Sequence, residues 1–332
     1  MTTTSAVILN FNGKEFLGKF LPAHQKYSKG IDVVVADNNS KDGSILFLQE
    51  NYPNIYVIQL DKNYGYAEGY NQALKEIDSD YIILINSDVE VTDGWYLAPI
   101  KFLEDNKDYA ACQPKILSYD NRNNFEYAGA SGGFIDMLGY PYCRGRVFDQ
   151  VEKDEGQYDS VIDIHWASGA CLFIRNNLFK KMGGFDPVFF AHMEEIDLCW
   201  RLSNNKWKIA CVPQSKVFHV GGGTLSKNNP KKTYLNFRNN LLAIFKNMPK
   251  HQLYVILMLR FVLDFFVVLR FLSQGLIRHC ISVLKANRDF MFFKNLKTYR
   301  LTGKKTNPGE KLILIEYFLK KRRTFAEIHR SQ

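Results

Sequence analysis

Two aspartates in this chain stand where chemistry is expected, because each closely follows a run of apolar residues. Residues 81–85 read YIILI and lead to Asp88, while residues 33–36 read VVVA and lead to Asp37. Asp88 is placed to hold a divalent cation on a diphosphate, since Mg²⁺ is usually bound by one or two carboxylates together with phosphate oxygens. Asp37 is placed to accept a hydrogen bond from the imide N–H of a pyrimidine base. The alternative for both is an ordinary turn or helix-cap role.

The second half of the chain adds acidic and basic groups to these aspartates. Glu194, Glu195 and Asp197 lie within four residues, and His219 ends an apolar run. One of the glutamates is a candidate to accept a proton from a substrate. The alternative is that the three acids lie in the first turn of a helix, where the helix dipole favours negative charge. A histidine side chain ordinarily titrates near neutral pH and binds metals readily, although a single histidine such as His219 is more often structural.

The elements that position these residues alternate between strands and helices. Residues 5–10, 31–37, 54–60 and 81–86 are predicted to be strands, and helix-like spacing follows each of the first three. Such alternation is typical of a doubly wound, mostly parallel sheet flanked by helices. Ligands bind such sheets beyond the carboxyl ends of the strands. We therefore expect Asn10 and Asn12 after the first strand to join Asp37 and Asp88 at one edge.

The chain falls into two predicted parts of different charge. Residues 1–229 hold 22 Lys+Arg and 29 Asp+Glu, a net charge of −7, whereas residues 230–332 hold 21 and 5, a net charge of +16. We predict an α/β catalytic domain over residues 1–229, with a nucleotide-binding half at about 1–117 and an acceptor half at about 118–229. Residues 118–162 are expected to form loops with short strands. Residues 230–332 are predicted to be a basic helical extension.

Several classes of protein are disfavoured by the sequence. The P-loop pattern G-x-x-x-x-G-K-[ST] is absent, and the glycines at 221–223 lack the spacing of a dinucleotide-binding loop. The six cysteines form no C-x-x-C pair and several lie in apolar runs, which indicates buried free thiols rather than disulfides or zinc.

Six motifs in the same order resemble the family 2 glycosyltransferases with the GT-A fold, and the rhamnosyltransferase-like branch is the most similar by eye. The resemblance covers roughly residues 5–245. The motifs are VVVADNNSKDGS (33–44), NYGYAEGYNQAL (63–74), LINSDVEV (84–91), WASGACLFIR (166–175), GGFDPVFFAHMEEIDLCWRL (183–202) and VFHVGGGT (217–224).

The resemblance implies a role for each matching residue. Asp88 would bind Mg²⁺ or Mn²⁺ with His219 as a further ligand, and Glu195 would be the general base with Glu194 as its neighbour. The sequence departs from the family pattern twice, because Asn86 replaces the first aspartate of the D-x-D motif and Glu195 replaces the second residue of the usual Glu-Asp pair. Which glutamate is the base stays open. The residues implied to bind the nucleotide-sugar are Asn10, Asn12, Asp37, Asn63, Gly65, Asn71, Asn86 and Ser87.

The reaction implied by the resemblance is sugar transfer with inversion. A dTDP-sugar or UDP-sugar, with dTDP-rhamnose as one candidate, would donate to a hydroxyl of a glycan or lipid-linked saccharide in cell-surface polysaccharide synthesis. One alternative is a nucleotidyltransferase acting on sugar phosphates. The other is a nucleic-acid binder that uses the basic tail, which the long apolar run beside that tail disfavours, so no nucleic-acid partner is expected.

Residues 251–286 are apolar apart from a charged stripe. At 100° per residue, Arg260, Asp264, Arg270, Gln274, Arg278 and Lys285 fall on one side of a helix. The interruptions argue against a spanning helix and favour one lying in a membrane interface, with its basic residues toward anionic lipid. The alternative is a helix packed on the catalytic domain with its charged stripe facing water. We expect a cytoplasmic protein, peripheral on the inner face of the cell membrane, and KKRR at 320–323 would add to the attraction.

Overall fold

Four parallel strands form the first half of the central sheet in the computed structural model, which describes residues 2–221, 229–293, 305, 307 and 309–330. The middle residues of the first, second and fourth of these strands are buried on both faces, as continuous apolar runs predict, whereas the third lies at the edge and is partly exposed. Strand β1 pairs with β2 on one side and with β4 on the other, so Asn10, Asp37 and Asn86 all lie at one edge. The strands are β1 (Thr4–Asn10), β2 (Asp32–Asp37), β3 (Tyr56–Gln59) and β4 (Tyr81–Asn86).

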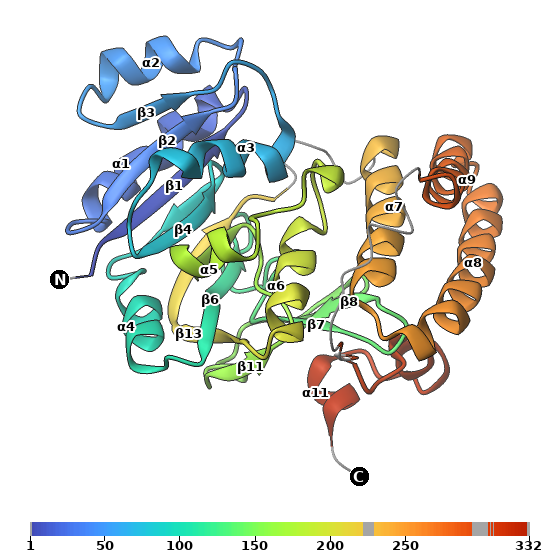
Figure 1. The fold of residues 1–332 in the computed structure, drawn as a ribbon. Helices are drawn as coiled ribbons and strands as arrows, with labels where there is room; N and C mark the ends of the chain where they lie inside the picture. Colours follow the sequence, from blue (N-terminus) through green and yellow to red (C-terminus); the bar gives the residue numbers. More distant parts are fainter. Residues whose placement is uncertain (1, 222–228, 294–304, 306, 308, 331–332) are drawn as a thin grey trace.

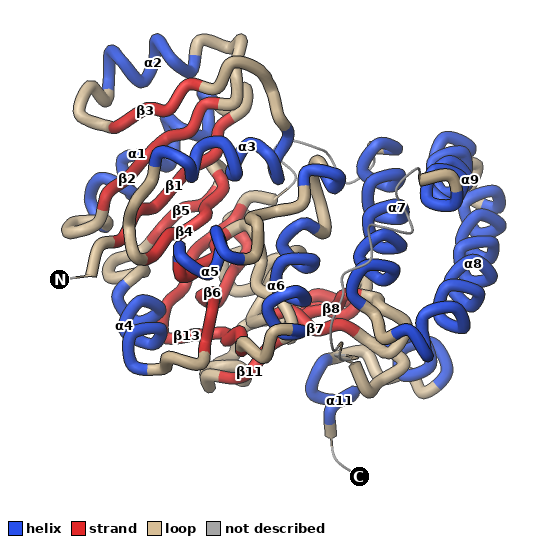
Figure 2. The backbone as a smooth tube through the Cα atoms, viewed as in Figure 1, coloured by secondary structure: helices blue, strands red, loops and turns tan. Residues whose placement is uncertain are grey.

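The second half of the chain completes a nine-stranded sheet, whose main order is β11-β13-β6-β12-β4-β1-β2-β3, with β5 paired to β13. Strand β12 runs antiparallel to β4 and β6, and β13 is parallel to β6. The expected α/β fold, a sheet flanked by helices, is therefore confirmed (Figure 2). The sheet is mixed, with parallel pairs throughout its first half and mostly antiparallel pairs in its second half. These strands are β5 (Val89–Val91), β6 (Tyr109–Ser118), β11 (Ile162–Ile164), β12 (Cys171–Arg175) and β13 (Lys208–His219).

Helices cover both faces of this sheet, and each face has its own hydrophobic core. Ile83 and Ile85 of β4 join one core, while Ile82 and Leu84 join the other, as the two-residue period of a strand requires. Helices α3, α5 and α6 lie in front of the sheet in Figure 1, and α1 lies behind it. The helices are α1 (Lys14–Tyr27), α2 (Ser44–Asn51), α3 (Gly65–Ala73), α4 (Leu97–Asp105), α5 (Asn176–Lys181) and α6 (Glu194–Asn204), with short 3₁₀ turns at Leu74–Glu76 and Pro187–Phe189.

A second, smaller sheet occupies the region predicted to hold loops and short strands. Its order is β10-β9-β8-β7, and all its pairs are antiparallel. The strands are β7 (Gly133–Ile135), β8 (Pro141–Cys143), β9 (Arg146–Val147) and β10 (Gln150–Val151). All six cysteines are buried and free, as expected.

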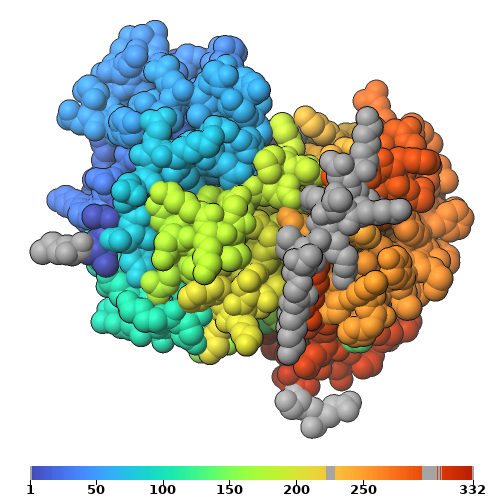
Figure 3. All heavy atoms as spheres, in the orientation of Figure 1, coloured from blue at the N-terminus to red at the C-terminus, as the bar shows by residue number. Residues whose placement is uncertain are grey.

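The C-terminal extension is helical and packs on the part of the chain that precedes it. Helices α7 (Pro230–Asn247), α8 (Lys250–Ser273) and α9 (Ile277–Met291) form a lobe beside α6 (Figures 1 and 3). A π-helical turn (Ile315–Leu319) and α11 (Phe325–His329) follow. One hydrophobic core contains residues from both sides of position 229, so the extension shares its core with the domain before it. Among the described residues, no helix is long and apolar enough to cross a membrane.

Two expectations for this extension are wrong. The helical run of 251–286 is two helices, because Gly275 adopts a positive φ of 72° that ends α8 and turns the chain toward α9. Most of the charged stripe of α8 faces neither water nor lipid, and only its end at Arg270 is exposed. Arg260 and Asp264 are buried, and the Arg260 guanidinium lies 3.6 Å from the ring centroid of Tyr140. The basic run at 320–323 is also partly engaged, since Lys320 and Arg322 both pair with Glu316.

Candidate active site

The carboxyl ends of β1 and β2 are joined by a network of short polar side chains. Asn10 Nδ2 donates to Asp37 Oδ2 at 2.9 Å and to Ser40 Oγ at 3.1 Å. Asp37 Oδ1 accepts from the backbone N–H of Ser40, which is the turn role weighed as the alternative for this residue. Asn12, at a positive φ of 51°, accepts from the backbone N–H of Lys41 and donates its own N–H to Ser40 Oγ. Asp37 is buried at 2% exposure, so its position is fixed by this turn.

The loop before α3 is shaped by asparagines. Asn63 Oδ1 accepts from the N–H of Gly65 at 2.8 Å, and Gly65 has a positive φ of 77°. Asn38 Nδ2 donates to the carbonyl of Gly65, and Asn38 Oδ1 accepts from the N–H of Tyr64. Asn71 points elsewhere: its amide exchanges two hydrogen bonds with the backbone of Phe185. Asn71 thus holds the segment that leads to α6.

His219 joins the ends of β4 and β13. Its Nε2 lies 3.1 Å from Asp88 Oδ1 and 3.4 Å from Asn86 Nδ2, while its Nδ1 lies 3.5 Å from Glu126 Oε2. Burial opposes charge on this imidazole, but the carboxylates of Asp88 and Glu126 outweigh burial and raise the pKa of His219 to about 10. Burial likewise opposes ionisation of both carboxyl groups, and the charge of His219 nevertheless keeps the pKa of each below its ordinary value.

Asp88 and His219 fit a divalent cation that is shared with a diphosphate. Two ligands at right angles on an ion with bonds of about 2.1 Å are roughly 3 Å apart, and the facing atoms of this pair are 3.1 Å apart. The carboxylate and the neutral imidazole are also ligand types that Mn²⁺ accepts, so a bound cation would take the place of the proton that the raised pKa keeps on His219. Within the described residues, no group of three His, Cys, Asp or Glu side chains is arranged to hold a metal by itself. Ligands from the donor would have to complete the set.

Glu194 and Glu195 open helix α6 after a strained turn. Phe190, His192 and Met193 all have positive φ values, which cost energy in residues other than glycine and cluster at functional sites. Burial, and then the charge of Glu195, hold the pKa of Glu194 well above its ordinary range, and burial raises the pKa of Glu195 to about 7. In the described part of the chain, Oε2 of each glutamate is buried without a hydrogen-bond partner. The pair thus has acceptor capacity left for a substrate.

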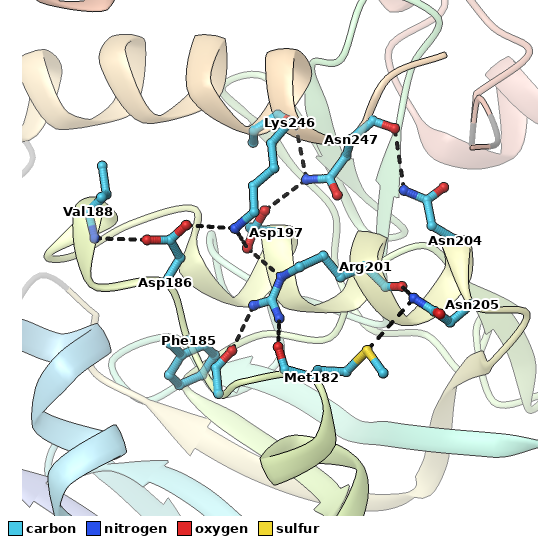
Figure 4. A network of polar contacts seen from close by, with 12 residues as sticks. Met182, Phe185, Asp186, Val188, Asp197, Arg201, Asn204, Asn205, Lys246 and Asn247 are labelled. Atoms are coloured by element: carbon cyan, nitrogen blue, oxygen red, sulfur yellow. Dashed lines mark hydrogen bonds and ion pairs between the residues drawn. The ribbon is translucent and has the colours of Figure 1, made fainter. Parts of the chain in front are cut away.

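Helix α7 of the C-terminal extension holds this turn and helix in place. Asn239 Nδ2 donates to the carbonyls of Phe189, Ala191 and His192, at 2.7–2.9 Å. Lys246 bridges Asp186 and Asp197, at 2.7 and 2.9 Å (Figure 4).

The buried Asp197 completes the same network (Figure 4). The Asp197 carboxylate also accepts hydrogen bonds from the side chains of Arg201 and Asn247. Both of these side chains also donate to backbone carbonyl groups. The positive charges of Arg201 and Lys246 offset burial and keep the pKa of Asp197 below its ordinary value. Asp197 therefore has a structural role, and the helix that carries the glutamates is fixed to α7.

A chain of contacts links the glutamates to the end of β4. The N–H of Asn86 donates to the carbonyl of Ala170, and the hydroxyl of Tyr66 donates to the neighbouring carbonyl of Gly169 at 2.7 Å. The N–H of Tyr66 donates to Phe190, four residues before Glu194. Burial raises the pKa of the Tyr66 hydroxyl, and the neighbouring Tyr70, Glu194 and Glu195 add to this effect. Ser87 lies at the same edge, because a Cβ on Gly13 would come within 3.3 Å of its Oγ.

Sequence reasoning missed five residues of this site. Glu126 follows a loop with no recognisable pattern, and Asn239 and Lys246 lie in a helix that was assigned to the membrane-associated tail. Asn38 stands beside Asp37 in the VVVADNNS turn, so its position was a signal that could have found it. The fifth residue is Tyr66, in the motif at 63–74.

The chain is similar to known glycosyltransferases over much of its length. The family model described as glycosyl transferase family 2 matches residues 5–183. An N-acetylglucosaminyl-diphospho-decaprenol L-rhamnosyltransferase of Mycobacterium tuberculosis is 28% identical over 57% of this chain and 66% of its own length, just under two thirds. The rhamnosyltransferase WbbL of Escherichia coli is 25% identical over 64% of this chain and 81% of its own.

Solved structures show the same fold at low sequence identity. GalNAc-T7, crystallised with UDP, GalNAc and Mn²⁺, gives a TM-score of 0.55 at 17% identity, over 66% of this chain and 43% of that one. The mannosyltransferase PcManGT of Pyrobaculum calidifontis, in complex with GDP-Man and Mn²⁺, gives 0.54 at 11% identity, over 88% of each chain. The fold is therefore the GT-A fold, and the chain belongs to glycosyl transferase family 2.

Proposed function

We propose that this glycosyltransferase moves a sugar from a nucleoside diphosphate to a hydroxyl group with inversion at the anomeric carbon. The donor is a dTDP-sugar or UDP-sugar, with dTDP-rhamnose favoured by the similarity to two rhamnosyltransferases. One observation carries the proposal: Asp88 and His219 meet at the end of β4, and hydrogen bonds through Ala170, Gly169 and Tyr66 connect that end to the turn before Glu194.

The nucleotide is proposed to lie over the ends of β1 and β2. Each oxygen of Asp37 accepts one internal hydrogen bond and keeps a second lone pair, which is available to the imide N–H of uracil or thymine. The rigid asparagine loop at Asn63 and Gly65 would lie beneath the diphosphate. Asn10, Asn12, Asn86 and Ser87 are proposed to line the same site, while Asn71 acts through Phe185.

Asp88 and His219 are proposed to hold Mg²⁺ or Mn²⁺ against the diphosphate. When bound, such a cation stabilises the negative charge of a leaving diphosphate. Asn86 supplies a neutral amide where the family has a carboxylate, so the protein contributes one full negative charge at Asp88. Glu126 is proposed to orient the imidazole of His219, as outer carboxylates commonly do for metal-binding histidines.

Glu195 is proposed to accept the proton of the attacking hydroxyl. A general base works best when its pKa lies near the working pH, and the pKa of Glu195 is about 7. Glu194 has the higher pKa of the pair and is buried, so it is the better candidate to keep a proton and orient its neighbour. The rigid mounting of α6 on α7 would hold the base in position.

The acceptor is proposed to be a glycan or a lipid-linked saccharide in cell-surface polysaccharide synthesis. The relative in Mycobacterium tuberculosis bears a name that includes a diphospho-decaprenol acceptor, and this supports a lipid-linked acceptor here. The enzyme would then work in the cytoplasm, peripheral on the inner face of the cell membrane.

Product analysis with a panel of donors tests this function. The purified protein, Mn²⁺ and a lipid-diphosphate saccharide are incubated with dTDP-rhamnose, UDP-N-acetylglucosamine or UDP-glucose. We expect one donor to yield a nucleoside diphosphate and a glycoside of inverted anomeric configuration, detected by NMR. A retained configuration would refute the inverting mechanism. Pyrophosphate release from a nucleoside triphosphate and a sugar phosphate would instead indicate a nucleotidyltransferase.

A further inference from the structure

The outer face of α8 is apolar and exposed along the whole helix. Nine large side chains on it are between 41% and 65% exposed. At 100° per residue they fall within an arc of roughly 140°, so they form one continuous stripe. The stripe, here termed the α8 face, consists of Tyr254, Val255, Met258, Leu259, Val262, Phe265, Phe266, Leu269 and Leu272.

The polarity of α8 is the reverse of that of a helix on a water-exposed surface. Its charged residues Arg260 and Asp264 point inward, at 2% and 1% exposure, and Arg260 donates to the carbonyl of Leu138. Its apolar residues point outward, whereas a helix that faces water shows the opposite arrangement. Figure 1 shows α8 on the side of the α7–α9 lobe that is farthest from the sheet. The inner side of α8 is held by protein, so only its outer face is available to a partner.

The amount of exposed apolar surface is large for a soluble monomer. Nine half-exposed side chains of this size leave on the order of 900 Å² in water, above the roughly 300–600 Å² of the largest patch on a typical monomer. Six further exposed apolar residues continue into α9, namely Leu276, Ile277, Ile281, Leu284, Met291 and Phe292. Together these account for 15 of the 25 large apolar side chains that are exposed among the described residues.

The charge around this face is positive. Residues 250–291 contain six Lys+Arg and two Asp, a net charge of +4. Asp264 is buried and Asp289 pairs with Arg288, whereas Arg270, Arg278 and Lys285 are exposed. Arg270 lies beside the apolar arc by the same helical geometry. An apolar face bordered by cations matches a bilayer interface that contains anionic lipid.

We propose that the α8 face inserts into the interface of an anionic lipid bilayer, with the exposed arginines of α8 and α9 at the headgroups. The inference deepens the proposed function and rests on it for the lipid-linked acceptor, because it names the surface that brings the enzyme to that acceptor. Tyr254, Phe265 and Phe266 are the residues that enter the interface, and the buried Arg260 fixes the helix to the β7–β8 turn.

Vesicle flotation tests this inference without any sugar transfer. The full chain is mixed with vesicles of phosphatidylcholine containing 30% phosphatidylglycerol, roughly the anionic content needed for a strong surface potential. We expect Phe265→Ser/Phe266→Ser to lower the partition coefficient about tenfold or more, since two large side chains no longer transfer from water. The matched control is Leu46→Ser/Leu97→Ser, which removes two apolar side chains of 58% and 57% exposure elsewhere and should leave binding unchanged.

The charge requirement is tested with a second pair of variants. Arg270→Gln/Arg278→Gln should weaken binding to the anionic vesicles several-fold and leave binding to pure phosphatidylcholine unchanged. Lys101→Gln/Lys208→Gln, which removes two exposed lysines on the other part of the molecule, should have no effect. An equal loss of vesicle binding in the two test variants and in their two controls would overturn the inference.

The outcomes separate this inference from the proposed function. A wild-type protein that transfers sugar to a soluble acceptor but does not float with vesicles would overturn the inference alone. A protein that floats but shows no transfer would overturn the function alone. If light scattering shows a dimer that Phe265→Ser/Phe266→Ser dissociates, and vesicles do not bind, the face is an interface between two copies and the bilayer proposal is wrong.

Discussion

His219 Nε2 lies 3.1 Å from Asp88 Oδ1, although 130 residues separate the two positions in the chain. Backbone pairing explains the approach, because His219 ends β13 opposite Val89 of β5, directly after Asp88. Glu126 lies on the other side of the imidazole, 3.5 Å from Nδ1. Two buried carboxylates thus flank one histidine at the edge of the sheet where a donor diphosphate is proposed to bind.

Replacement of Glu126 by Gln should weaken Mn²⁺ binding by about 10-fold to 100-fold, because outer carboxylates orient metal-binding histidines. Isothermal titration with Mn²⁺ and a nucleoside diphosphate measures this effect directly, without turnover. The matched control is Glu50→Gln, which changes an exposed carboxylate on α2. Unchanged Mn²⁺ affinity in Glu126→Gln would show that Glu126 only fills space beside His219.

Glu195→Gln should lower kcat by at least about 100-fold while it leaves donor affinity within a few-fold, since general base catalysis typically contributes 10²–10⁴. Steady-state kinetics and donor titration together measure the two effects. Glu194→Gln should be milder if Glu194 only supports its neighbour. A larger loss of kcat in Glu194→Gln would transfer the base role to Glu194.

Glu195→Gln should also raise the free energy of unfolding above neutral pH. The pKa of Glu195 is raised from 4.5 to about 7 in the folded protein, so the folded state binds more protons than the unfolded state between these values. The free energy of unfolding therefore falls as the pH rises through this window, and the full penalty is present above pH 7. Glu195→Gln should remove a penalty on the order of 1–3 kcal/mol at pH 8 and almost none at pH 4. Urea titrations at both pH values measure the difference, and equal stabilisation at both would contradict it.

The pH dependence of kcat should report the same group. A base with a pKa of about 7 is protonated below that value, so kcat should rise with pH up to about 7 and then level off. Stopped assays between pH 5 and pH 9 with saturating donor measure this profile. A flat profile between pH 5 and pH 7 would mean that the proton acceptor has an ordinary carboxylate pKa.

Lys246→Met tests whether α7 supports the catalytic helix. The substitution leaves Asp186 and the buried Asp197 short of a positive charge, and loss of one partner from a buried ion pair costs about 3 kcal/mol. Helix α6 should also shift, and kcat should fall more than donor affinity. The control is Lys101→Met, which breaks an exposed pair with Asp105 and should cost less than about 0.5 kcal/mol. Equal effects of the two substitutions on thermal unfolding would show that the network is not important.

The alternation of strands and helices along the chain could be predicted from the sequence, because apolar runs and helical spacing alternate clearly over residues 5–86. The meeting of Asp88 and His219 was expected from the resemblance to the family, whose motifs imply that His219 joins Asp88 as a metal ligand. Glu126 could not be found, because its place depends on how the loop after β6 returns to the sheet. Asn239 and Lys246 were missed because a basic helix gives no sign that its polar residues hold backbone groups of another segment.

The orientation of α8 was predicted wrongly for a physical reason. Helical periodicity separates a charged stripe from an apolar one, but it does not say which stripe faces the protein. The ring of Tyr140 and the carbonyl of Leu138 contact Arg260, so the part of the charged stripe at Arg260 and Asp264 is buried, while Arg270 is exposed. Partners that lie far away in sequence therefore decided the orientation.

The most direct measurement is nucleotide binding, monitored by thermal shift. The wild-type protein, Asp88→Asn and Glu195→Gln are each tested with dTDP and with UDP, in the presence and absence of Mn²⁺. We predict that Mn²⁺ and one of the two nucleotides together raise the Tm of the wild type and of Glu195→Gln by several degrees, as bound ligand stabilises the folded state. The same pair should leave the Tm of Asp88→Asn unchanged. An equal Mn²⁺-dependent rise in Asp88→Asn, or the absence of any rise in the wild type with either nucleotide, would contradict the proposed site.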